Sequence, residues 1–266
     1  MTGAAQTRWL LAADGVRISV AHRSAYGAGG DGGPGRSLAF VLAHGFGGSG
    51  ASPAMRAVTA TLRAYGGVLA LDFRGHGRSS GRSTVGDGEV EDVTAAVGWA
   101  RLLGYRAVVT VGWSMGASVV IRHAAATDGV QAVVAVSGPA RWFYRGTPQM
   151  RLVHVLVERR GGRLASRLLL GTRIAATGWD PLPDAPWQVV GRIAPVPLLV
   201  VHGDQDPYFP VEHARILYSC ANEPKELWVV PGFGHAESAA GPGLVHRIGA
   251  WAQHAVSLGT AGRSLR

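Results

Sequence analysis

The sequence predicts an α/β fold in which a mostly parallel sheet of about eight strands is covered by helices on both faces. Three observations support this class. The 266-residue chain is 47% hydrophobic and only 16% charged, which suits one large domain and excludes a disordered chain. Short continuous apolar runs alternate with helical patterns, as is typical of buried parallel strands. One stretch, residues 138–190, lacks strand patterns and is expected to be a helical insertion.

The elements follow in chain order from apolar spacing and from turn and capping signals. An antiparallel N-terminal hairpin is expected because residues 8–12 and 16–21 flank Asp14-Gly15, a strong two-residue turn signal. A glycine-rich surface connection over residues 26–35 comes next. Buried strands are then expected at residues 38–43, 68–71, 107–111, 130–136, 196–201 and 227–230. Helices are expected at residues 52–66, 89–103, 115–126, 211–218 and 244–257.

The strandless stretch divides the chain into two expected parts. Residues 1–137 and 191–266 form the core domain, and residues 138–190 form a cap over the carboxyl ends of the strands. Within the cap, one helix is expected from Thr147-Pro148 to near Gly161-Gly162, and an amphipathic segment follows to about Leu170. Eight arginines against three acidic residues give the cap a net charge of +5. Such charge suits a solvated face, or attraction of an anionic substrate, acyl carrier or lipid surface.

Composition narrows the function classes. The net charge is +9, but the basic residues are dispersed without interleaved aromatic residues, so nucleic acid is not an expected partner. Cys220 is the single cysteine, which excludes an internal disulfide and is compatible with a reducing cytoplasm. The N-terminal residues do not show the pattern of a secretory leader, and apolar runs stay shorter than a membrane span requires, so a cytoplasmic location is expected. Metal-ligand spacings are absent too, and cofactors are not implied.

A candidate nucleophile lies directly after the apolar run at residues 107–111. Ser114 is the centre of Gly112-Trp113-Ser114-Met115-Gly116, and a helical pattern follows. Strand, G-x-S-x-G and helix in that order indicate a sharp turn that exposes the serine hydroxyl above a sheet. Glycines suit such a turn because a Cβ would crowd the neighbouring backbone.

The remaining catalytic candidates also follow strands. His235 lies in a glycine-rich loop after the strand at residues 227–230, and it is the expected base because ligand sites form at strand carboxyl ends. Asp206 or Asp204, which follow the preceding strand, can hold the far N–H of that imidazole. The expected oxyanion donors are the amides of Met115 and Phe46.

Other residues near these candidates receive supporting roles. His44, in the loop His44–Gly48, is expected to bond backbone rather than act as a second base. The expected walls of a substrate pocket are Trp113, Trp142, Phe143, Tyr144 and Met150, and ordinary core or cap packing is the alternative for these residues.

Taken together, these motifs resemble the α/β-hydrolase superfamily, in its serine esterase and lipase branch of carboxylesterase-like and monoacylglycerol-lipase-like proteins. The resemblance extends from about Val16 to Ala252. It implies a Ser114–Asp206–His235 triad, favours Asp206 over Asp204, and implies hydrolysis of an ester or thioester through an acyl-enzyme. The expected partner is a small-molecule acyl ester or thioester, for which an anionic or a lipid-like substrate stays open. The segments that carry the likeness are residues 44–48, 72–79, 112–116, 202–210 and 232–237.

Several alternatives stay open from the residues. Carbon–carbon bond hydrolases and cofactor-free peroxidases share this apparatus, and a hydrolase-fold ligand receptor could keep it with little turnover. Dehalogenase and epoxide-hydrolase relatives carry aspartate where this chain has Ser114, so those chemistries are disfavoured. Residues 45–50 also spell G-x-G-x-x-G, and Asp72 ends the next strand, as in a dinucleotide-binding protein. That reading places the glycines before the helix start at Ser52-Pro53 and leaves the other motifs as coincidence. Asp72, Arg74 and His76 are instead expected to form a turn.

Overall fold

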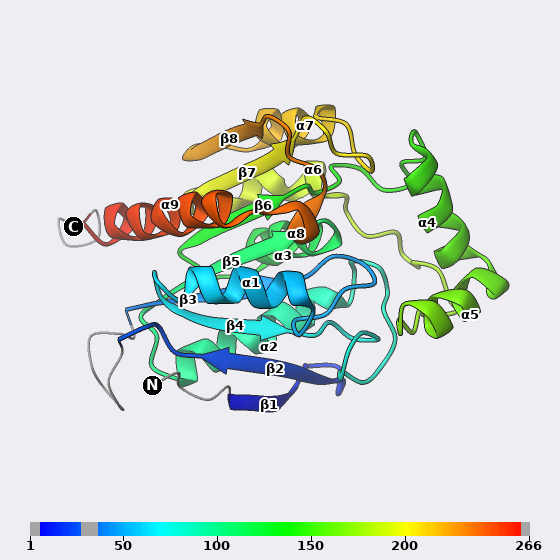
Figure 1. The fold of residues 1–266 in the computed structure, drawn as a ribbon, viewed down its shortest axis with the longest axis horizontal. Coiled ribbons are helices and arrows are strands. Elements are labelled where there is room, and N and C mark those ends of the chain that lie inside the picture. The colour runs from blue at the N-terminus through cyan, green and yellow to red at the C-terminus, as the bar shows by residue number, and fades with distance from the viewer. Residues whose placement is uncertain (1–5, 28–36, 262–266) are drawn as a thin grey trace.

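A computed structural model describes residues 6–27 and 37–261, and its centre is one eight-stranded sheet (Figure 1). The strand order is β1-β2-β4-β3-β5-β6-β7-β8. The strands are β1 (Gln6–Leu11), β2 (Arg17–Arg23), β3 (Leu38–Ala43), β4 (Gly67–Leu71), β5 (Ala107–Trp113), β6 (Ala132–Val136), β7 (Leu198–Gly203) and β8 (Lys225–Val230). Pairing is antiparallel from β1 to β2 and from β2 to β4, and parallel elsewhere. The predicted fold class is therefore confirmed.

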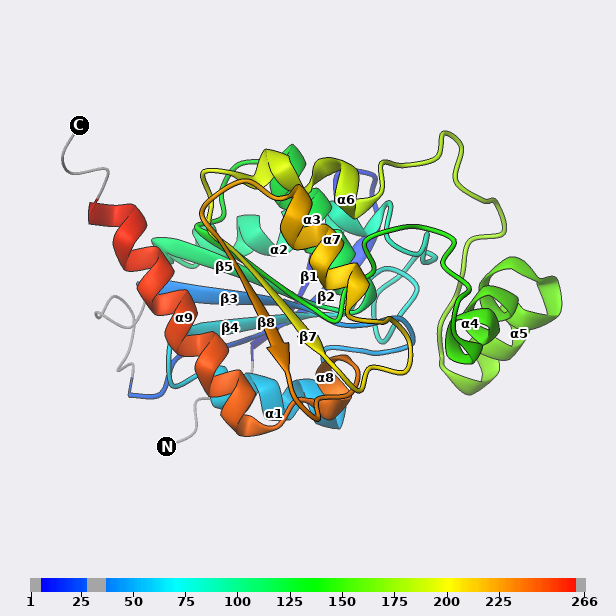
Figure 2. The same cartoon turned by 90° about the horizontal axis from the view of Figure 1, so that it is seen from above.

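Helices cover both faces of the sheet (Figure 2). One face carries α1, α8 and α9, and the other carries α2, α3 and α7. The helices are α1 (Pro53–Leu62), α2 (Glu89–Leu102), α3 (Met115–Ala126), α4 (Pro148–Glu158), α5 (Arg160–Leu169), α6 (Pro186–Val189), η2 (Val190–Ile193), α7 (Glu212–Cys220), α8 (Ala236–Ala239) and α9 (Pro242–Ala261). Burial on both faces explains why the central strands read as continuous apolar runs.

The core has two apolar clusters, one on each face of the sheet. Successive residues of a strand point to opposite faces, so Phe40 and Leu42 pack toward α1 and α9 while Val41 packs toward α2 and α3. All three side chains are fully buried, and each contributes about 1.5–3 kcal/mol of hydrophobic stabilisation. This rigid frame brings the carboxyl ends of β3, β5, β6, β7 and β8 to one edge of the sheet.

The segment between β6 and β7 leaves that edge, and its helices α4 and α5 stand beyond the sheet (Figures 1 and 2). The expected end of the first helix at Gly161-Gly162 is wrong. Arg159 adopts an extended conformation and ends α4, and both glycines lie in the first turn of α5. A Cβ on Gly162 would meet the Val155 carbonyl oxygen at 2.0 Å, so this glycine permits close packing of α5 on α4.

Two further points concern regions without a strong pattern. The short helices α6, η2 and α8 have no distinct sequence signal, because four residues are too few to establish a helical period. Most of the glycine-rich connection predicted over residues 26–35 lies outside the described residues.

Candidate active site

Ser114 occupies a strained turn between β5 and α3. Its φ of 52° and ψ of −117° lie in a region that non-glycine residues rarely adopt. A Cβ on Gly112 would lie 2.2 Å from the Gly116 carbonyl oxygen, and one on Gly116 would lie 2.2 Å from the Ala43 carbonyl oxygen. Only glycine therefore fits at either place, and the turn raises the Ser114 side chain above the edge of the sheet.

His235 and Asp206 continue from Ser114 as a hydrogen-bonded row. The Ser114 Oγ lies 2.8 Å from His235 Nε2, and His235 Nδ1 lies 2.8 Å from Asp206 Oδ2. A carboxylate accepts, so Nδ1 carries the imidazole proton and Nε2 is left to accept from the hydroxyl. The Tyr208 ring lies against the imidazole at a centroid separation of 4.3 Å and restricts its rotation.

Asp206, rather than Asp204, reaches the imidazole. The Asp206 carboxylate is fully buried, and its Oδ1 accepts the backbone N–H groups of Tyr208 at 2.8 Å and Phe209 at 3.1 Å. Asp204 instead accepts the Gly232 N–H at 2.7 Å, which ties the loop before His235 to the end of β7. The two aspartates thus hold the imidazole and its loop respectively.

A second histidine lies beside the same carboxylate. His202 Nε2 is 3.6 Å from Asp206 Oδ2 and donates to the Phe209 carbonyl at 2.9 Å. Burial lowers the pKa of His202, so the ring stays neutral near pH 7. His202 is therefore a neutral neighbour of Asp206, while His235 is the ring that hydrogen-bonds its carboxylate at 2.8 Å.

Two backbone amides belong to residues that line the same cavity as the serine. Phe46 and Met115 both line the cavity that contains Ser114. Within the described part of the chain, neither amide N–H hydrogen-bonds another group. Met115 is also the first residue of α3, where the helix dipole favours negative charge. A developing oxyanion would find two available donors here.

Buried polar groups support the loop that carries Phe46. His44 donates from Nδ1 to the Gly45 carbonyl at 2.7 Å and accepts the Phe73 N–H on Nε2 at 3.1 Å. Complete burial lowers the pKa of His44 to about 3, so the ring is neutral. His76 accepts the Gly47 N–H at 3.3 Å. Both rings therefore act as structural partners of the loop.

Asp72, which follows β4, holds the loop of residues 45–50 by hydrogen bonding. Its Oδ1 accepts the Gly50 N–H at 2.8 Å, and its Oδ2 accepts the Arg78 N–H at 2.9 Å. Helix α1 begins at Pro53 with Ser52 as its N-cap, beyond the glycines of residues 45–50. A carboxylate occupied by loop amides, and glycines outside the helix, both argue against a dinucleotide site.

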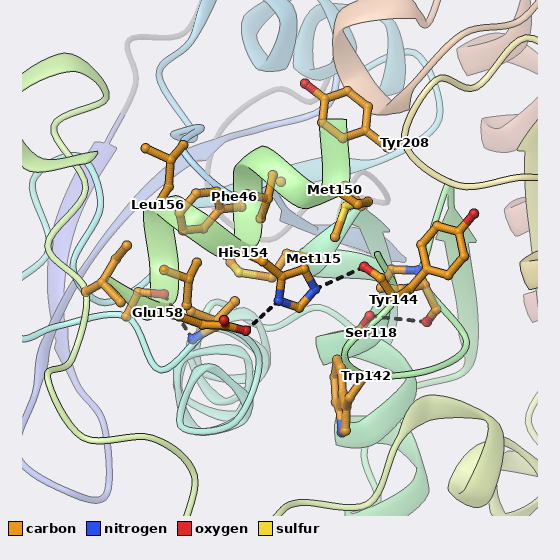
Figure 3. Close-up of a pocket in the computed structure, with 18 of the residues that line it drawn as sticks. Phe46, Met115, Ser118, Trp142, Tyr144, Met150, His154, Leu156, Glu158 and Tyr208 are labelled. Carbon is orange, nitrogen blue, oxygen red and sulfur yellow. Dashed lines mark hydrogen bonds and ion pairs between the residues drawn. The ribbon is translucent and has the colours of Figure 1, made fainter. Parts of the chain in front are cut away.

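An extended cavity of about 850 Å³ lies between this edge of the sheet and the segment containing α4 and α5. Its walls are mainly apolar, and Figure 3 shows how Phe46, Met115, Tyr144 and Met150 surround it. Of the expected walls, the four that line it are Trp142, Phe143, Tyr144 and Met150. The prediction for Trp113 is wrong. Its side chain lies in the core cluster on the α1 and α9 face of the sheet, where it is fully buried. It does not line the cavity.

Several residues of the site had no assigned role in the sequence. Tyr208 and Phe209 lie against the imidazole, and Ser137 accepts the Ala236 N–H at 3.1 Å, beside His235. Glu237 accepts the Gly45 N–H at 3.2 Å and so joins the histidine loop to the Phe46 loop. Apolar spacing along residues 148–158 could have identified α4 as a wall, since Val153, Leu156 and Val157 also line the cavity.

The polar end of the cavity lies on α4. His154 contacts the Glu158 carboxylate through Nδ1 at 2.7 Å and the Tyr144 carbonyl through Nε2 at 3.0 Å (Figure 3). Hydrogen bonds from His154 and Arg145 hold the pKa of Glu158 below its usual value. Among the described residues, no group of three or more His, Cys, Asp or Glu side chains is placed to hold a metal ion. Across that same portion, the helices lack the length and apolar character for crossing a membrane.

Comparisons with known proteins agree with this fold. The model described as the alpha/beta hydrolase family matches residues 40–246. A monoacylglycerol lipase of Mycolicibacterium smegmatis is 30% identical over 204 residues, which cover 63% of this chain and 70% of that protein. The sequence match therefore extends well beyond a single motif.

Solved structures share the fold at low sequence identity. The Pyrococcus furiosus esterase Pf2001 superposes with a TM-score of 0.71 at 22% identity and covers 96% of this chain and 92% of its own. Est1E of Butyrivibrio proteoclasticus, solved with ferulic acid bound, gives 0.65 at 20% identity and covers 91% and 96%. The chain therefore belongs to the alpha/beta hydrolase family and is an enzyme of its esterase- and lipase-like type.

Proposed function

We propose that this protein hydrolyses a carboxylic ester through an acyl-enzyme formed on Ser114. The observation that carries the proposal is the row Ser114–His235–Asp206, with 2.8 Å at both hydrogen bonds, at the base of an apolar cavity. Ester and thioester carbonyls have the electrophilic carbon and developing oxyanion that such a site serves. The related monoacylglycerol lipase supports an oxygen ester as the substrate class.

In the acylation step, the Ser114 oxygen attacks the carbonyl carbon while its proton passes to His235 Nε2. The Asp206 carboxylate stabilises the imidazolium that forms and keeps its Nδ1–H directed toward Oδ2. The carbonyl oxygen becomes an oxyanion, and the Phe46 and Met115 amides donate to it. His235 then protonates the leaving alkoxide, so an alcohol departs and the acyl group remains on Ser114.

In the deacylation step, water replaces the alcohol. His235 Nε2 takes a proton from the water as its oxygen attacks the acyl carbon, and the same two amides hold the second oxyanion. Collapse breaks the bond to Ser114, which recovers its proton from His235. The products are a carboxylic acid and the free enzyme, and no other co-reactant than water is consumed.

The cavity supports a substrate with a sizeable apolar part. Its walls combine aromatic side chains from residues 142–144 with the inner face of α4, including Met150 and Val153. We propose that residues 138–190 act as a cap and that the core comprises residues 1–137 and 191–266. The polar cluster around His154 and Glu158 supports a substrate whose far end carries hydroxyl or similar groups.

The deciding test compares the wild type with Ser114→Ala on p-nitrophenyl esters of increasing chain length. The wild type should release nitrophenol at least about 1,000-fold faster than the variant, and a fluorophosphonate probe should label Ser114. Ser118→Ala is the matched control, because Ser118 also lines the cavity but lies outside the hydrogen-bonded row.

Equal slow release by wild type and Ser114→Ala would instead indicate a ligand receptor. Turnover of a diketone or of peroxide without ester cleavage would favour the carbon–carbon hydrolase or peroxidase reading.

A further inference from the structure

Helix α5 exposes three leucines to solvent, of which Leu164 and Leu168 lie on its outer face. Leu164, Leu168 and Leu169 are 57%, 73% and 80% exposed. The buried positions of the helix are Gly162 and Ser166, which are small or polar. A surface helix normally buries its large apolar residues, and α5 does the reverse. Exposing them to water does not stabilise the fold, so this surface indicates a binding site.

Arginines lie beside these leucines in a defined arrangement. Residues three and four apart share a helix face, so Arg160, Arg163 and Arg167 form one row, and Leu164 and Leu168 form the adjacent row. The helix carries no acidic residue. Arg160 and Arg167 are exposed, so the apolar row is flanked by uncompensated positive charge.

Helix α5 also adjoins the cavity. Arg163, from its inner side, and Leu170, just beyond its last turn, both line the cavity. Leu170 Cδ1 lies 3.3 Å from the place a Cβ on Gly47 would take, next to the loop of Phe46. The helix therefore has an inner side on the candidate active site and an outer side that faces away from the sheet (Figure 2).

We propose that the outer face of α5 docks on an anionic lipid surface. Leucines that enter the acyl region, flanked by arginines at the headgroup level, are the physical requirements of a helix lying in a membrane interface. A second copy of this chain fits less well, because it would bring another arginine row against the first on a protein of net charge +9. This inference does not depend on the proposed function, since binding can be measured without turnover.

The test is co-sedimentation of the full chain with vesicles of equal parts phosphatidylglycerol and phosphatidylcholine, and with pure phosphatidylcholine. The wild type should bind the anionic vesicles more tightly, and added salt should weaken that binding. Leu164→Ser with Leu168→Ser should weaken it at least about tenfold. Arg160→Gln with Arg167→Gln should weaken it about 25-fold, at roughly fivefold for each charge.

Matched controls come from exposed residues elsewhere. Leu11→Ser with Leu102→Ser removes two leucines that are 69% and 86% exposed, and Arg56→Gln with Arg106→Gln removes two exposed charges. These pairs should bind as the wild type does. Equal losses in control and α5 pairs, or absent vesicle binding, would overturn the proposal. So would wild-type self-association in analytical ultracentrifugation that the leucine pair abolishes while vesicle binding is unchanged.

Discussion

Asp206→Asn isolates the role of the buried carboxylate with almost no change in shape. The Tyr208 and Phe209 N–H groups both donate to Oδ1, so an amide must keep its oxygen on that side. Its NH₂ group then faces His235 Nδ1, where the carboxylate oxygen was. Two donors cannot face each other, so the imidazole must move its proton to Nε2. In that tautomer Nε2 points an N–H at Ser114 and cannot accept the serine proton.

The expected loss follows from that change of tautomer. A base in the wrong tautomer lowers kcat by about 10⁴-fold in a serine triad, equivalent to about 5.5 kcal/mol of transition-state stabilisation. KM should change little, because Asp206 is fully buried and does not line the cavity. The melting temperature should stay close to that of the wild type, since every hydrogen bond of the site can still form.

Steady-state hydrolysis of a short p-nitrophenyl ester measures kcat and KM separately. Asp204→Asn is the control, because Asp204 bonds the Gly232 amide and not the imidazole; it should keep activity within a few-fold. A loss below about tenfold in Asp206→Asn, or an equal loss in both variants, would refute the reasoning about the tautomer.

Three further predictions concern the turn, the loops and the response to acid. Gly116→Ala should lower the free energy of unfolding by about 1–3 kcal/mol and abolish most activity, because the new Cβ meets the Ala43 carbonyl. Thermal melting measures the loss of stability. The control Gly161→Ala should show no such loss, because its Cβ meets nothing. Glu237→Ala should lower kcat about tenfold by releasing a loop amide, whereas Glu237→Gln should keep most activity in the same ester assay. Burial lowers the pKa of His123 from 6.5 to about 4, so the unfolded chain binds the proton first as pH falls. Denaturant unfolding should therefore show about 2 kcal/mol less stability from this residue at pH 5 than at pH 7, and His123→Leu should lack that part of the loss.

The residues that could be predicted from sequence are those positioned by the backbone. Ser114, Asp206 and His235 each follow a strand directly, and parallel strands bring their carboxyl ends to one edge. Chain order and strand ends therefore suffice to place them together. Phe46 and Met115 follow the same logic, because their amides belong to backbone at that edge, in the loop after β3 and in the first turn of α3, and do not depend on a side-chain direction.

The roles that could not be predicted are those that depend on the direction of a side chain. Trp113 is next to Ser114 in sequence, yet alternation along β5 turns it into the core, whereas Tyr208 reaches the imidazole from another loop. The same limit holds for α5. Its arginines are visible as charge in the sequence, but the exposure of Leu164 and Leu168 depends on how Gly162 packs the helix on α4. Amphipathic spacing predicts that a helix has an apolar face, and only the packed structure reveals that this face is turned outward, where a lipid surface can bury it.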